Sequence, residues 1–400
     1  METNPRALSV ASCARRRAVT RAPSRSIVRS ARDARARARE DGGGESASDV
    51  LALARLRGAL ARVDEARSSA GGRWREVEGA HVRLPSMARP WACAHFVGGA
   101  VLGSAPRTAY DALLSRCAEE GVVVIATPYD LDLDHGRLSR ECGEMYARAR
   151  ARVCEDEGLD PRTTPTFRFG HSLGCKLLTL LACEEDARAS GATGSAGVGA
   201  DGTIDMDVDE TSGTAVAVGA RRSESDVAVA GHFLVAFNNA DATDSVRLIE
   251  KFARELLKTR GGGASAAASD LFGALPSLAA FAERAAKAAG LEFEPTPEET
   301  LERARTRFVS RRTRLIKFKK DDLDQNDQLL EALKARFKVY PGRVDARELD
   351  FGNHLTPVFF STDGLKLSPA LDKLIGQFSF GDEEGVRKLA AEFAAFIREK

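Results

Sequence analysis

The chain has 400 residues, with 59 Lys and Arg against 58 Asp and Glu, and a formal net charge of +1. Residues 1–39 contain eleven Arg and only two acidic residues, so the remainder has 48 basic and 56 acidic residues. The acidic composition of this remainder argues against a general nucleic-acid binder, which needs a basic surface to displace counterions. No apolar run approaches the roughly 18 residues of a membrane-spanning helix. The seven Cys form no CxxC pair and no Cys/His ligand spacing, which favours reduced thiols over a disulfide framework or zinc site.

The N-terminal segment, residues 1–40, is rich in Arg, Ala and Ser and nearly free of acidic residues. This composition is typical of an organelle transit peptide, with the chloroplast as the expected address and the mitochondrion as the alternative. A disordered basic tail that binds acidic partners is a second interpretation. A linker and an amphipathic helix are expected over residues 41–71, because Leu and Val recur there at helical spacing.

From residue 72 to residue 400, apolar runs of strand length alternate with helical patterns. An early strand around residues 74–84 is expected to pair at an edge. Nearly continuous apolar strands that alternate with helices predict a mostly parallel sheet covered by helices on both faces. The further predicted strands span residues 92–97, 122–127, 166–170, 232–238, 314–318 and 348–351. The predicted helices span residues 110–119, 138–155, 176–183, 325–337 and 384–399.

Two stretches interrupt this alternation. Residues 184–226 are mostly Gly, Ala, Ser, Thr and Asp and cannot bury enough apolar surface to order themselves, which predicts a disordered acidic insertion. Calcium binding by Asp205, Asp207 and Asp209 is disfavoured, because the Gly and the terminal Glu of an EF-hand loop are missing from that register. Residues 240–308 show helical patterns broken by Pro between two predicted strands, where we expect a helical lid.

The sharpest chemical signal is the G-x-S-x-G sequence of residues 170–174, between the predicted strand TFRF and the helical segment KLLTLLAC. Strand, tight turn and helix are the context of a nucleophile elbow. In such an elbow Ser172 has a strained backbone, and the two Gly allow close approach of neighbouring chain. The N–H of Leu173 is then the first expected oxyanion donor. His171, inside the motif, is interpreted as a packing residue rather than a base.

A second oxyanion donor should come from the loop after an earlier strand. The sequence HFVGGA ends such a strand in a turn of small residues, so the N–H groups of Gly99 and Ala100 are the candidates. One donor of this kind contributes about 3 kcal/mol of transition-state stabilisation. A turn that serves only packing is the alternative. Phosphate binding is disfavoured, because neither G-x-G-x-x-G nor a P-loop Lys is present.

A Ser hydroxyl needs a base, and the base needs an orienting acid. In this chain order the acid follows the Ser and the His comes last. Of the six His, only His354 lies late enough. The acid should follow the strand predicted at 314–318, where Asp321 fits the expected register best, Asp324 second and Asp322 third. Clustered carboxylates also suit a helix N-terminus, so at least one is expected to serve only there.

These motifs together resemble an α/β-hydrolase-like family of phototrophs, known as domain of unknown function 1350. The resemblance runs from about residue 74 to residue 357 and is interrupted by the acidic insertion. It implies an α/β-hydrolase fold for residues 72–400 and, for eukaryotic members, a chloroplast address, but no substrate. The matching stretches are HFVGGAVLGSAP, GVVVIATPYDLDLDH, FGHSLGCKL, FNN, EPTPEETL, LIKFKKDDLDQ and GNHLTP.

We therefore expect a plastid serine hydrolase that acts on a small-molecule ester or thioester, with no cofactor or metal. Ser172 would attack, His354 would carry the proton and Asp321 would orient His354. Apolar residues of the expected lid would suit a lipid-like acyl chain, although helix packing explains them equally well. The alternative is a non-catalytic binding or assembly factor in the chloroplast that keeps the elbow for structure. A haloperoxidase- or transferase-like use of the same residues is a third interpretation, and the sequence identifies no protein partner.

Overall fold

The computed structural model describes residues 74–86, 89–100, 102–191, 229–241, 292–361 and 379–399. The expected transit peptide, linker and amphipathic helix lie outside the described residues. So do most of the expected acidic insertion, with its three Asp, and most of the expected lid. The alternating strands and helices of the main domain are described almost completely.

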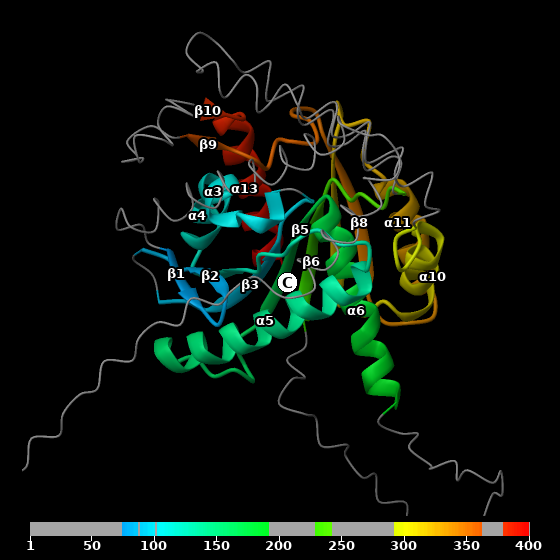
Figure 1. The fold of residues 1–400 in the computed structure, drawn as a ribbon, viewed down its shortest axis with the longest axis horizontal. Helices are drawn as coiled ribbons and strands as arrows, with labels where there is room; N and C mark the ends of the chain where they lie inside the picture. The colour runs from blue at the N-terminus through cyan, green and yellow to red at the C-terminus, as the bar shows by residue number, and fades with distance from the viewer. Residues whose placement is uncertain are drawn as a thin grey trace, which may run out of the picture. The chain divides into compact units, whose positions relative to one another are not determined.

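An eight-stranded sheet organises the described residues (Figure 1), in the order β1-β2-β4-β3-β5-β6-β7-β8. Strand β2 pairs antiparallel with both neighbours, whereas all pairs from β4 to β8 are parallel. The strands are β1 (Trp74–Val77), β2 (Ala80–Arg83), β3 (Ala92–Val97), β4 (Val122–Ala126), β5 (Thr166–His171), β6 (Val229–Val235), β7 (Arg312–Phe318) and β8 (Arg343–Leu349). Two short strands, β9 (Phe360–Ser361) and β10 (Ser379–Phe380), pair antiparallel in a separate ribbon.

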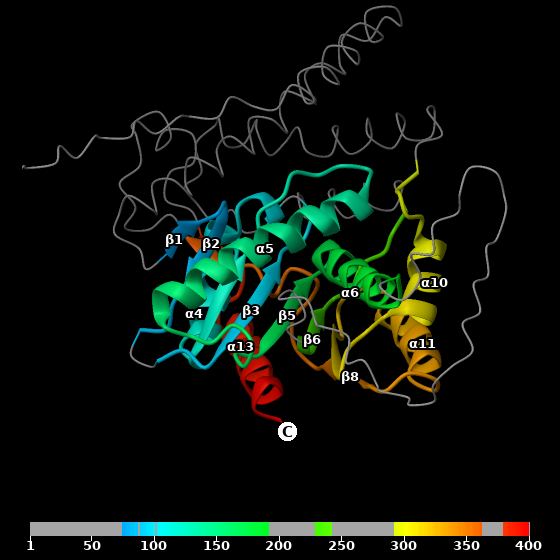
Figure 2. The ribbon, with the colours of Figure 1, turned by 90° about the horizontal axis from the view of Figure 1, so that it is seen from below.

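Helices cover both faces of this sheet (Figures 1 and 2). Helices α4 and α13 share a core with the sheet face that includes Phe96, Phe169 and Phe233. Helices α5, α6, α10 and α11 cover the opposite face, which includes Val97 and Leu234. The helical segments are η1 (Leu102–Ser104), α3 (Pro106–Ala109), α4 (Asp111–Ala118), α5 (His135–Glu157), α6 (Leu173–Gly191), α10 (Pro297–Arg307), α11 (Asn326–Arg336) and α13 (Glu383–Arg398).

The side-chain pattern explains why these segments take these positions. Every residue of β4, with the sequence VVVIA, is buried, as expected for a strand covered on both faces. Helix α13 buries Leu389, Phe393 and Phe396 on one stripe, which confirms its predicted amphipathic face. Helix α10 begins with a capping box between Thr296 and Glu299.

Two predicted elements differ clearly from the structure, and the strand predicted at 232–238 lies three residues earlier, at Val229–Val235. The early strand is a hairpin, because Glu78 and Gly79 have positive φ angles of 51° and 83° and turn the chain back. Strand β8 begins at Arg343, five residues before the apolar signal at residue 348, because this edge strand exposes most of its side chains. The strand order and the strand–turn–helix at residue 172 confirm the expected α/β-hydrolase fold. The last part of the expected lid forms α10, which packs against α6 and α11, and most of the expected lid lies outside the described residues.

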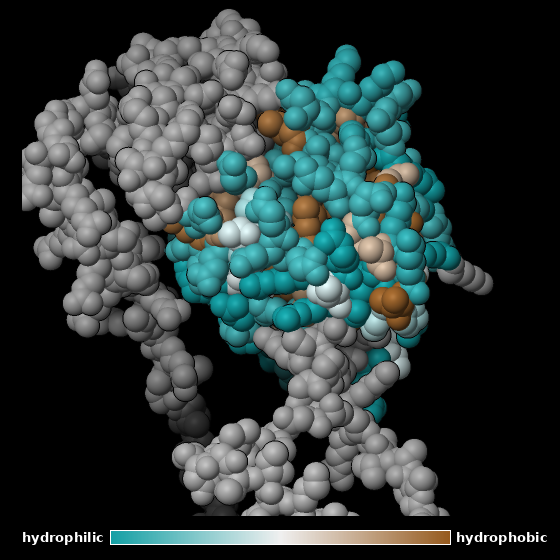
Figure 3. Space-filling view, turned by 90° about the vertical axis from the view of Figure 1, so that its right-hand side faces the viewer, coloured by the Kyte–Doolittle hydropathy of each residue, from teal (hydrophilic) through white to brown (hydrophobic). Residues whose placement is uncertain are grey.

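The described surface is mainly hydrophilic on the face shown in Figure 3, where apolar residues stand apart from one another. Scattered apolar residues of this kind are ordinary for a protein surface. Within the described part of the chain, no helix is both long and apolar enough to cross a bilayer.

Candidate active site

Ser172 lies at the turn between β5 and α6, where its φ angle of 55° is in the left-handed region. Non-Gly residues rarely adopt this conformation, and it persists only when the surroundings hold it. The Ser172 N–H donates to Val235 O at 3.0 Å. A Cβ at Gly174 would lie 2.0 Å from Val97 O, and one at Gly170 would lie 2.8 Å from Cys175 Cα. Both Gly of the motif are therefore needed for close approach, as the sequence predicted.

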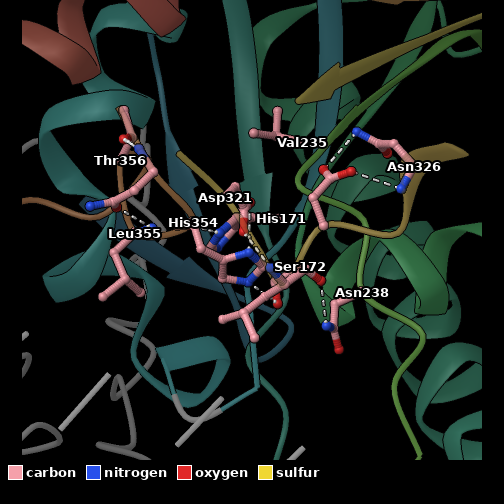
Figure 4. A network of polar contacts seen from close by, with 12 residues as sticks. His171, Ser172, Val235, Asn238, Asp321, Asn326, His354, Leu355 and Thr356 are labelled. Atoms are coloured by element: carbon pink, nitrogen blue, oxygen red, sulfur yellow. Dashed lines mark hydrogen bonds and ion pairs between the residues drawn. The ribbon is translucent and has the colours of Figure 1, made fainter. Parts of the chain in front are cut away.

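His354 and Asp321 meet Ser172 at the carboxyl edge of the sheet (Figure 4). His354 Nε2 lies 2.9 Å from Ser172 Oγ, and His354 Nδ1 lies 2.9 Å from Asp321 Oδ2. The three residues are at most 7% exposed. Since an ionised carboxylate can only accept, Nδ1–H donates to Asp321, and Nε2 is left to accept from the Ser172 hydroxyl. The structure thus brings together the three residues that the sequence put forward.

A tight turn after β8 holds His354 in place. Gly352 has a φ angle of 75°, which L side chains rarely adopt. The Asn353 side chain accepts from the Leu355 N–H at 2.9 Å, and Thr356 Oγ1 accepts from the Asn353 N–H at 2.7 Å. The residues on both sides of His354 are therefore fixed by local hydrogen bonds.

The loop after β7 separates the three predicted acids by role. Asp321 accepts from His354 and from the Leu323 N–H, the latter at 3.0 Å. Burial raises the pKa of Asp321, but these hydrogen bonds and the nearby imidazoles outweigh it, so its pKa lies below the usual value. Asp324 instead accepts from Asn326 N and Nδ2, at 2.8 and 2.9 Å, at the start of α11. Burial raises the pKa of Asp324 to about 7, and Asp322 is exposed.

Asn238, in the loop after β6, connects the elbow to the acid loop. Its Nδ2 donates to Leu323 O at 3.0 Å, and its N–H donates to Ser172 O at 3.4 Å. The N–H of the next residue, Asn239, donates to Gln325 Oε1 at 2.6 Å. No chemical role was predicted for these residues, although two Asn within four residues of the end of a buried strand are a signal for this edge of the sheet.

The structure corrects one of the predicted oxyanion donors. The Gly99 N–H donates to Tyr110 Oη at 2.8 Å, so the prediction of Gly99 as a free donor is wrong. Tyr110 lies between α3 and α4, and its phenol oxygen accepts this hydrogen bond. Ala100 remains the predicted donor from this loop. The N–H of Leu173 is the first in α6 and has no acceptor within its own helix.

His171 is more than a packing residue. Its Nδ1 lies 2.8 Å from Tyr110 Oη, and its Nε2 lies 2.8 Å from the backbone oxygen of His354. Burial lowers the pKa of His171 to about 3, and the nearby His354 imidazole contributes a smaller lowering. The ring is therefore neutral at ordinary pH, and it contacts His354 through the backbone oxygen of that residue.

Among the residues that the structure describes, no three or more His, Cys, Asp or Glu side chains are grouped as ligands for a metal ion. The polar groups of the site are instead paired with one another along the line from Asp321 to Ser172.

The family model described as "Protein of unknown function (DUF1350)" matches residues 73–193 and 221–377. The chain belongs to this family. The stretch of this DUF1350 protein that the model leaves out, between residues 193 and 221, falls within the predicted acidic insertion. Among curated proteins, none matches the sequence.

Several solved structures are similar to this DUF1350 protein at low identity. The hyperthermophilic esterase from the archaeon Pyrobaculum calidifontis has 14% identity and a TM-score of 0.45, over 88% of this chain and 94% of that one. The Francisella virulence factor BioJ has 11% identity and a TM-score of 0.45, with the same coverage of both chains. A thioesterase domain from the curacin biosynthetic pathway has 14% identity and a TM-score of 0.36, over 80% of this chain and 97% of that one.

Proposed function

We propose that this protein is a serine hydrolase that cleaves an ester or thioester. The observation that carries the proposal is the line of two 2.9 Å contacts from Asp321 through His354 to Ser172. Ser172 keeps a strained left-handed backbone at its end of the line. Strain of this kind is often found where the backbone must present a reactive group.

Each residue has a defined task in the reaction. His354 Nε2 takes the hydroxyl proton as Ser172 Oγ attacks the carbonyl carbon of the substrate. The Leu173 and Ala100 N–H groups stabilise the negative charge that develops on the carbonyl oxygen. His354 then gives the proton to the leaving alcohol or thiol, and an acyl group remains on Ser172. Water, activated by the same imidazole, releases the acid and restores the hydroxyl.

Asp321 supports this proton transfer through its charge. Its pKa lies below the usual value, so it stays ionised while His354 gains a proton. A carboxylate at 2.9 Å from Nδ1 stabilises the imidazolium that forms and keeps Nδ1 protonated, so that Nε2 faces the hydroxyl.

A fluorophosphonate probe applied to the full-length chain tests the proposal. Labelling is expected in the wild type and lost in Ser172→Ala. Ser139→Ala is the matched control, because Ser139 is also buried. Its hydroxyl donates to Leu177 O, where α5 packs against α6. Absence of labelling in a folded wild-type sample would overturn the hydrolase and favour a binding or assembly factor. A series of p-nitrophenyl esters and acyl thioesters of increasing chain length then defines the acyl group, a lipid-like chain included.

We also propose a plastid address for this activity. The Arg-, Ala- and Ser-rich composition of residues 1–40 supports it. The full chain carrying a fluorescent protein at its C-terminus should accumulate in plastids, and accumulation in mitochondria or the cytosol would contradict the proposal.

A further inference from the structure

A continuous line of hydrogen bonds joins the candidate oxyanion loop to the candidate base. It runs from the Gly99 N–H to Tyr110 Oη, from Tyr110 to His171 Nδ1, and from His171 Nε2 to His354 O. Each of the three distances is 2.8 Å. The line connects the segment after β3, the last residue of β5 and the loop after β8, and Figure 4 shows His171 directly beside His354.

The two ends of this line fix the direction of every proton in it. A backbone N–H can only donate, so Tyr110 Oη accepts from Gly99 and gives its own hydrogen to His171 Nδ1. A backbone carbonyl can only accept, so His171 Nε2–H donates to His354 O. One neutral tautomer of His171 therefore satisfies every group.

Burial keeps this arrangement intact. Tyr110 is 0% exposed and His171 is 2% exposed, so water does not compete for their polar atoms. Burial lowers the pKa of His171 to about 3 and raises the pKa of Tyr110, so neither group changes its charge near neutral pH. The Tyr110 ring is also held edge-on against Phe96, with the ring centres 4.8 Å apart.

The candidate oxyanion loop, which contains Gly99 and Ala100, is in close contact with His171, a member of this line of hydrogen bonds. A Cβ at Gly99 would lie 3.2 Å from His171 Nδ1 and 3.3 Å from Ser172 Cβ. The backbone that leads to the Ala100 N–H is thus in close contact with both the elbow and the His171 ring. A shift of His171 would move this loop and the loop that carries His354 together.

We propose that Tyr110 and His171 are positioning residues that set the Ala100 N–H and His354 at the correct separation around Ser172. The inference rests on the proposed hydrolase function. Neither residue takes up a proton in the reaction. They act through the Gly99 backbone on one side and the His354 backbone on the other, at a site where a displacement of about 1 Å can cost about 100-fold in rate.

Their removal should therefore affect the chemical step more than substrate binding. Tyr110→Phe keeps the ring against Phe96 but removes both hydrogen bonds of the hydroxyl. We expect kcat for an ester, and the rate of fluorophosphonate inactivation, to fall about 10- to 100-fold, with KM changed less than about threefold.

Tyr146→Phe in α5 is the matched control. Tyr146 is also buried, and its hydroxyl lies 3.0 Å from Thr166 Oγ1, at the opposite end of β5 from Ser172. The Tyr146→Phe variant should lose about as much stability as Tyr110→Phe but keep the wild-type kcat. Equal kcat in the two variants would overturn the inference while the hydrolase stands.

A pair of substitutions at His171 gives a second measurement should Tyr110→Phe not fold. A Gln side chain can donate an amide hydrogen to His354 O, whereas a Leu side chain fills space and donates nothing. His171→Gln is therefore expected to keep at least tenfold more kcat than His171→Leu, and equal losses would contradict the proposal. A folded wild-type chain that neither hydrolyses esters nor reacts with the probe would overturn the proposed function and this inference with it.

Discussion

His354 and Asp321 stand 33 residues apart in the chain and are joined by a 2.9 Å contact between Nδ1 and Oδ2. They come from the loops after two adjacent parallel strands, β8 and β7. Because parallel strands end at the same edge of a sheet, their loops meet there. Ser172, at the end of β5, lies at that same edge.

The first prediction concerns the choice of acid. Asp321→Asn should lower kcat by about 10⁴-fold, because an amide in place of the carboxylate allows the wrong imidazole tautomer. Asp324→Asn should keep kcat within a few-fold, since its partner is Asn326 and not His354. Ester hydrolysis by the two purified variants decides between them, and equal losses would remove Asp321 from the mechanism.

The second prediction concerns close approach at the elbow. Gly174→Ala should be strongly destabilising, because its Cβ would meet backbone atoms, with Val97 O at 2.0 Å. Gly158→Ala is the control, since Gly158 has a φ angle of 63° and no neighbour within 4 Å. It should cost only about 1 kcal/mol, from backbone strain alone. Chemical denaturation measures both, and equal stability of the two variants would show that the elbow has more room.

The third prediction isolates the strain at Ser172. Ser172→Gly and Ser172→Ala both remove the hydroxyl, but only Gly adopts a φ angle of 55° freely. The Gly variant should therefore be more stable than the Ala variant by about 1 kcal/mol. Thermal and urea unfolding of the two proteins test this, and an Ala variant that is the more stable of the two would indicate a relaxed turn.

The fourth prediction concerns stability at low pH. Burial lowers the pKa of His135 and His171 to about 3, and those of His95 and His232 well below their usual value. Between pH 6.5 and 3 the unfolded chain binds protons at these His that the folded chain does not. Stability should therefore fall as the pH drops below about 6.5, with each His contributing up to about 1.4 kcal/mol per pH unit.

Asp324 opposes this trend and provides the control for it. Burial raises its pKa to about 7, so between about pH 4 and 7 the folded chain holds a proton that the unfolded chain lacks. Asp324→Asn should accordingly make the loss of stability between pH 7 and pH 5 steeper. Urea midpoints that stay constant over this interval in the wild type would contradict the expected burial of the four His.

Local patterns were enough to predict the elements that are buried on both faces. The run VVVIA predicted β4, and the strand–turn–helix context predicted the elbow around Ser172. The hairpin of β1 and β2 was missed, although Gly79 could have indicated its turn. The first residues of β8 were missed because an exposed edge strand has no apolar run to reveal it.

The chain order of the candidate acid and base could be predicted, whereas the residues that hold the site in place could not. Asp321 and His354 follow from their positions after late strands. Tyr110 was not predicted, because its role depends on contact with His171, 61 residues away in the chain. Asn238 likewise acts on Leu323, 85 residues further on, and no local pattern reports a contact of that range.

Helix α6 has 19 residues and so extends about 28 Å from Ser172. Its end at Gly191 and the start of β6 at Val229 both belong to the edge of the sheet away from Ser172. An insertion between these two ends therefore enters and leaves the described fold away from Ser172. The same junction is a suitable place to graft a reporter domain, since the graft would leave the elbow and its neighbours untouched.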